Sequence, residues 1–139
     1  MSAPPFTSLV ASLPSTIPFV GPEAIERRRK ETFRVRLGAN ESTFGVSPKA
    51  AAAMAAEMSR IAWYGDPEGY DLRAAIAAEH GVEMDQICLG AGIDELLGVV
   101  VRMLVEPGVP VLTSLGAYPT FNYHVAGFGG ELLRVPYRN

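Results

Sequence analysis

The sequence predicts an α/β fold with a mainly parallel sheet, and two observations lead to this prediction. From residue 86 onward, β-type runs alternate with helical stretches: "QICLG", a helix from about 93 to 105, "PVLTS", a helix from about 118 to 127, and "ELLRVP". Alternation at this spacing is typical of βαβ units, whose parallel strands are joined by right-handed crossovers. In addition, 48% of the 139 residues are hydrophobic and 19% are charged, which is enough apolar content for a core.

The first 21 residues predict an extended arm. Pro4, Pro5, Pro14 and Pro18 each remove a backbone donor and interrupt helices, and apolar residues lie between them. Because such an arm cannot bury its apolar side chains alone, we expect segment 1–21 to lie on another surface.

The middle of the chain predicts three helices and one strand. A short charged helix begins at a proline suited to the first helical position and covers 22–31. Apolar residues alternate with arginines over 33–37, which is the period of a half-buried strand. A proline follows Ser47 at the start of an alanine-rich helix over 48–61. After the loop "WYGDPEGY", Asp71 is expected to cap a helix that Gly81 ends.

Composition excludes several classes of protein. The net charge of −3 and the pI near 5.4 leave no basic surface for nucleic acid, and the run "ERRRKE" is flanked by acids. No stretch has the length of a membrane span, and the N-terminus has no signal-peptide pattern. The single cysteine, Cys88, is expected to pack as a small hydrophobe in a reducing compartment. We therefore expect a cytoplasmic protein.

A glycine-rich turn, "GAGIDELL", precedes the predicted helix at 93. Gly90, Gly92 and Gly98 do not form the dinucleotide fingerprint, because Glu95 stands where the third glycine is required. Two interpretations remain open from these residues alone: a tight strand-to-helix turn, or a phosphate site at a helix N-terminus. The carboxylates of Asp94 and Glu95 favour the helix dipole and do not exclude an anion held by backbone N–H groups.

Four motifs in order carry a family resemblance: "LGANESTFGVSPKA", "WYGDPEGYDLRAAIAAEHGV", "ICLGAGIDELL" and "PGVPVLTSLGAYPTFNYHVAGFGGELLRVP". Together they resemble the N-terminal part of histidinol-phosphate aminotransferases, which belong to the fold-type I enzymes that use pyridoxal 5'-phosphate. The resemblance implies the N-terminal part of the PLP-dependent transferase fold. It assigns 1–21 to the extended arm, 22–65 to part of the small domain, and 66–139 to the first part of the cofactor-binding large domain.

The resemblance also implies cofactor contacts. The turn at Gly92, Ile93 and Asp94 would give backbone N–H groups to the cofactor phosphate. Tyr118 would stack on the pyridine ring, and Tyr64 would reach the phosphate bound by the partner subunit. From the residues alone, a core aromatic at a helix start is the favoured interpretation of Tyr118, and Tyr64 could equally be a loop anchor.

Substrate and subunit contacts are implied as well. The segment that includes Asn40 and Gly45 would lie by the substrate, an amino acid or a 2-oxo acid. The proline-rich arm would pack on the second subunit of a homodimer, which supplies the surface that the arm requires.

The Schiff-base lysine of the family has no match in this chain. Lys30 lies in the charged run and Lys49 in a first helical turn, so neither is expected to be catalytic. Metal-ligand spacing is absent around His80 and His124. Because the chain also stops after the third predicted strand of its parallel sheet, we expect an inactive fragment of an aminotransferase. The alternatives are a silent phosphate-binding or dimerisation fragment, or another fold-type I enzyme such as a lyase or decarboxylase.

Overall fold

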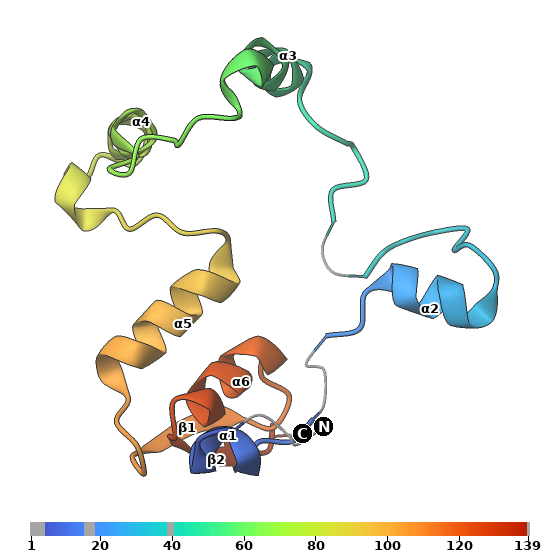
Figure 1. Ribbon diagram of the computed structural model, residues 1–139, viewed down its shortest axis with the longest axis vertical. Helices are drawn as coiled ribbons and strands as arrows, with labels where there is room; N and C mark the ends of the chain where they lie inside the picture. The colour runs from blue at the N-terminus through green and yellow to red at the C-terminus, as the bar shows by residue number, and fades with distance from the viewer. Residues whose placement is uncertain (1–4, 16–18, 39–40, 139) are drawn as a thin grey trace. The chain divides into compact units, whose positions relative to one another are not determined.

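The computed structural model describes residues 5–15, 19–38 and 41–138, and Figure 1 traces its helices and strands in chain order. Contacts between residues divide the chain into two units. The first unit comprises Met1–Val20 and Cys88–Asn139, and the second comprises Gly21–Ile87. The predicted assignment of chain segments to a small and a large domain stays a prediction.

A two-stranded parallel sheet forms the base of the first unit. Strand β1 (Pro110–Ser114) pairs with β2 (Glu131–Val135), with Pro110 opposite Glu131 at one end of the ladder. Helix α6 (Pro119–Gly127) connects the two strands and contacts β2. The parallel pairing predicted for "PVLTS" and "ELLRVP" is therefore confirmed, and the mixed helix-and-strand composition confirms the α/β class.

Helix α5 (Ile93–Leu104) packs against α6 through a small apolar contact. Val101 of α5 and Val125 of α6 are 1% and 0% exposed, respectively. The two helices approach closely at Gly98, where an added Cβ would lie 2.8 Å from Cε1 of His124. Helix α6 covers one face of α5, whereas Val100, Met103 and Leu104 of α5 remain exposed.

The predicted strand over residues 86–90 does not form. Gln86 ends a short 3-10 helix, η2 (Met84–Gln86), and the backbone that follows is extended at Ile87 but belongs to no ladder among the described residues. A run with β propensity needs a neighbouring strand to satisfy its backbone groups, and the described part of the chain offers none beside it. Cys88 is consequently exposed rather than packed.

The N-terminal arm contains a helix that the prolines did not suggest. Helix α1 (Ser8–Ser12) is capped by Thr7, whose hydroxyl accepts a hydrogen bond from the Val10 N–H at 3.3 Å. The prediction of a fully extended arm is wrong here, because Pro5 and Pro14 flank the helical turn without entering it. Pro4 and Pro18 lie outside the described residues.

The second unit is mainly helical. Its elements are α2 (Pro22–Arg29), α3 (Pro48–Ala56), the 3-10 turn η1 (Met58–Arg60), α4 (Tyr70–His80) and η2. These confirm the three predicted helices, although the alanine-rich helix ends earlier than expected and continues as η1. Gly81 ends α4 in the left-handed conformation, as its position predicted. None of the helices among the described residues is long and apolar enough to cross a membrane.

The start of α4 differs from the expected cap at Asp71. That residue lies inside the first turn, and the carboxylate that serves the helix start is Asp66. It accepts hydrogen bonds from the backbone N–H groups of Tyr70 at 2.8 Å and Glu68 at 3.0 Å. These bonds lower the pKa of Asp66 below its ordinary value of 3.8.

Segment 33–37 folds beside α2 instead of forming the predicted strand. The Phe33 N–H donates to the carboxylate of Glu26 at 2.8 Å, and the Arg36 guanidinium donates to Glu23 at 2.9 Å. Side chains of α2 thus hold this segment, and it pairs with no strand among the described residues.

Candidate functional site

The backbone at the start of α5 turns sharply at Gly92. This residue has φ 86° and ψ 178°, a region that is essentially restricted to glycine. A Cβ placed on Gly92 would meet no atom within 4 Å, so a ligand has room to approach the backbone of the turn. The N–H groups of Ile93 and Asp94 lie in the first helical turn, where no intrahelical acceptor exists. Together with the helix dipole, these donors suit an anion.

The first-turn carboxylate of Glu95 is used within the turn. It folds back and accepts a hydrogen bond from the backbone N–H of Ala91. Gly90 permits this approach, because an added Cβ there would lie 2.9 Å from a methyl carbon of Leu96 and 3.1 Å from the Glu95 carboxylate. This hydrogen bond joins Glu95 to the residue before Gly92 and does not use the N–H groups of Ile93 and Asp94.

Tyr118 is joined to the same turn by a hydrogen bond. It is the residue before α6, and its hydroxyl donates to Oδ1 of Asp94 at 2.9 Å across 24 residues of sequence. The contact between α5 and α6 brings these two predicted site residues together. The side chain of Tyr118 is 53% exposed, which disagrees with the interpretation as a core aromatic and leaves ring surface available to a ligand.

The other predicted site residues belong to the second unit. Tyr64 is fully exposed, so it does not anchor its loop by burial. Gly45 has φ +75° and an open Cβ position, and Asn40 lies outside the described residues. Within one unit, the structure thus brings together Gly92, Ile93, Asp94 and Tyr118, and the cofactor and substrate roles of all these residues stay predictions.

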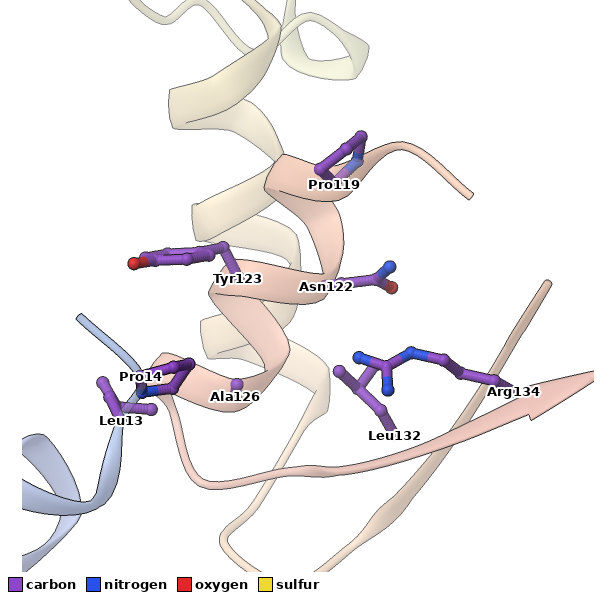
Figure 2. Close-up of a pocket in the computed structure, with 8 residues that line it drawn as sticks. All are labelled: Leu13, Pro14, Pro119, Asn122, Tyr123, Ala126, Leu132 and Arg134. Carbon is purple, nitrogen blue, oxygen red and sulfur yellow. The ribbon is translucent and has the colours of Figure 1, made fainter. Parts of the chain in front are cut away.

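A pocket of about 260 Å³ lies elsewhere in the first unit, between the arm, α6 and β2 (Figure 2). Figure 2 shows Asn122 and Tyr123 extending from opposite sides of α6, with Arg134 rising from β2. Oδ1 of Asn122 is buried without a hydrogen-bond partner among the described residues. Sequence reasoning missed this pocket, because its lining residues come from three separate segments and form no motif.

Among the described residues, the turn at Gly92 has neither a lysine nor a cluster of metal ligands beside it. Lys30 ends α2 in the left-handed conformation, and Lys49 lies in the first turn of α3; both are exposed residues of the second unit. No group of three His, Cys, Asp or Glu side chains that could hold a metal ion occurs in the described ranges. The described site is therefore a set of binding groups without a nucleophile.

Comparisons with known proteins agree on one group of enzymes, although no protein-family model matches the chain. The chain is 33% identical over 116 residues to histidinol-phosphate aminotransferase 2 of Nitrosospira multiformis, covering 84% of this chain and 30% of that protein. It is 38% identical over 100 residues to histidinol-phosphate aminotransferase 1 of Mesorhizobium japonicum, covering 72% and 27%, respectively.

Two solved structures share the fold. Histidinol-phosphate aminotransferase from Sinorhizobium meliloti, crystallised with pyridoxal-5'-phosphate, matches with a TM-score of 0.91 and 48% identity over 99% of this chain and 36% of that one. An aminotransferase from Mycobacterium tuberculosis matches with a TM-score of 0.67 and 25% identity, over 84% of this chain and 32% of that one. The resemblance and the fold predicted from the four motifs are confirmed, and the chain spans about a third of the length of these proteins.

Proposed function

We propose that the protein to which these 139 residues belong, a fold-type I aminotransferase by its sequence and fold relatives, uses pyridoxal 5'-phosphate to move an amino group between an amino acid and a 2-oxo acid. Because the similar proteins are histidinol-phosphate aminotransferases, we take histidinol phosphate as its expected substrate. The observation that carries the proposal is the pairing of Tyr118 with Asp94 directly after the open turn at Gly92.

The residues of this turn fit the phosphate of the cofactor. The open Gly92 lets a ligand approach the backbone, and the N–H groups of Ile93 and Asp94 would donate to phosphate oxygens. When bound, pyridoxal phosphate supplies an electron-withdrawing ring that stabilises negative charge on the substrate carbon. The exposed ring of Tyr118 would orient that pyridine by stacking and shield one of its faces from water.

Residues of the second unit would complete the site in a homodimer. The fully exposed Tyr64 has its hydroxyl free to reach a phosphate bound by a second subunit. Gly45 and Asn40 would lie by the substrate. Phe6 and Phe19 of the arm are 63% and 58% exposed, an apolar surface that a second subunit would cover. We further propose a cytoplasmic location, in keeping with one unpaired cysteine.

Equilibrium dialysis of the full-length protein against pyridoxal phosphate and against pyridoxal tests the phosphate site. We expect pyridoxal phosphate to bind at least about tenfold more tightly, because several charge-assisted hydrogen bonds contribute only when the phosphate is present. Equal affinity for the two compounds would refute the role of the turn.

The reaction class is tested separately. Incubation of the loaded full-length protein with histidinol phosphate and a 2-oxo acid is expected to yield the new amino acid. Release of carbon dioxide or cleavage of a carbon–sulfur bond from other amino acids, without amino transfer, would instead identify a decarboxylase or lyase. Cofactor binding without any turnover would favour the silent phosphate-binding alternative.

A further inference from the structure

We infer that Asp94 is a positioning residue, whose carboxylate holds the ring of Tyr118 in place over the start of α5. The same residue would then serve the site twice: its backbone N–H faces the anion, and its side chain orients the aromatic platform. This inference rests on the proposed function for its consequence, but the hydrogen bond between the two side chains stands on the geometry alone.

The backbone around Tyr118 is restrained by the residue that follows it, whereas packing covers only part of its side chain. Pro119 follows it, which disfavours helical dihedrals at Tyr118 and keeps it extended, with φ −53° and ψ 119°. The side chain is 53% exposed, so packing contacts cover about half of it. The described hydrogen bond of its hydroxyl goes to Asp94, and this bond fixes the outer end of the ring.

Asp94 is well suited to be the fixed partner. It lies in the first turn of α5, where the helix dipole stabilises a carboxylate. A charged acceptor makes a stronger and more directional hydrogen bond than a neutral one. Because α5 and α6 are joined through Val101, Val125 and Gly98, the carboxylate is held on a supported helix rather than on a loop.

The consequence concerns binding. A ring that is already oriented loses less side-chain freedom when a ligand stacks on it, so the cofactor binds more tightly. Removal of either partner should therefore weaken binding through the same loss, and removal of both should add nothing further. This non-additivity distinguishes a coupled pair from two independent contacts.

The test compares four variants of the full-length protein: Asp94→Ala, Asp94→Asn, Tyr118→Phe, and the double variant with Asp94→Ala and Tyr118→Phe. Dialysis against pyridoxal phosphate is expected to give dissociation constants about threefold to tenfold higher for Asp94→Ala, for Tyr118→Phe and for the double variant alike. Asp94→Asn keeps an acceptor oxygen and should stay within about twofold of the unsubstituted protein. Additive losses, or an Asp94→Asn variant as weak as Asp94→Ala, would overturn the inference.

A second readout does not depend on the cofactor. NMR of the ligand-free protein with ¹³C-labelled tyrosine rings reports the order of the Tyr118 side chain. We expect this ring to become mobile in Asp94→Ala and to remain ordered in Asp94→Asn. A ring that is equally ordered in both would refute the positioning role. If the unsubstituted protein binds no pyridoxal phosphate, the proposed function fails, while the NMR comparison still decides whether Asp94 holds the ring.

Discussion

Replacement of Gly92 by alanine tests the local geometry of the predicted phosphate turn. The residue lies at φ 86° and ψ 178°, where an L-amino acid is strained, and its Cβ would meet no atom within 4 Å. The cost of Gly92→Ala is therefore a backbone cost alone, without a steric contribution. We expect Gly92→Ala to lower the free energy of unfolding by about 1–3 kcal/mol, which is the usual cost of a residue in such a backbone region. This cost corresponds to roughly a fivefold to 150-fold change in the unfolding equilibrium constant.

Gly127→Ala is the matched control within the same unit. Gly127 is the last residue of α6, has no positive φ, and likewise offers an open Cβ position. Alanine there should be neutral or should stabilise by up to about 1 kcal/mol, because it lowers the entropy of the unfolded chain and favours helix. The two substitutions add the same methyl group, so opposite signs would isolate the conformation of Gly92 as the cause.

Urea unfolding followed by far-ultraviolet circular dichroism measures both variants. Hydrogen exchange at the first-turn amides of α5 then shows whether the loss is local to the helix start. A Gly92→Ala variant that is as stable as Gly127→Ala, with unchanged exchange in α5, would refute the reasoning that the turn requires glycine.

Three further outcomes are expected. Gly98→Ala should lower the free energy of unfolding by about 0.5–2 kcal/mol, because its Cβ would lie 2.8 Å from Cε1 of His124 and the cost of displacing that ring exceeds the gain from alanine inside a helix; an unchanged melting temperature would contradict this packing. The pKa of Asp66 is lowered by the backbone N–H of Tyr70, so its stabilisation of α4 is present above its ordinary pKa of 3.8 and disappears as the pH falls through the folded value. Amide exchange in the first turn of α4 should accelerate over that range in the native protein but not in an Asp66→Asn variant. Tyr64→Ala should leave stability within about 0.5 kcal/mol, since the side chain is fully exposed, yet should weaken pyridoxal phosphate binding; unchanged binding would remove Tyr64 from the site.

Local signals were sufficient for much of the fold. Proline at the first helical position, alanine-rich composition and a terminal glycine predicted α2, α3 and α4, since helices satisfy their own backbone hydrogen bonds within a short segment. Strands could not be predicted as securely. The run at 86–90 and the alternating segment at 33–37 have suitable residues, but neither has a neighbouring strand among the described residues, and a strand exists only as part of a ladder.

For the candidate site, the sequence by itself determined the open glycine turn, the acidic first turn of α5 and the proline that holds Tyr118 extended, because each depends on adjacent residues. Only the tertiary structure decided the uses of the two carboxylates: Glu95 closes the turn on Ala91, and Asp94 accepts the hydroxyl of Tyr118 at 2.9 Å. The second contact joins positions 24 residues apart, and it depends on how closely α5 approaches α6. That approach is set by side-chain volumes at the helix contact, which sequence periodicity does not encode.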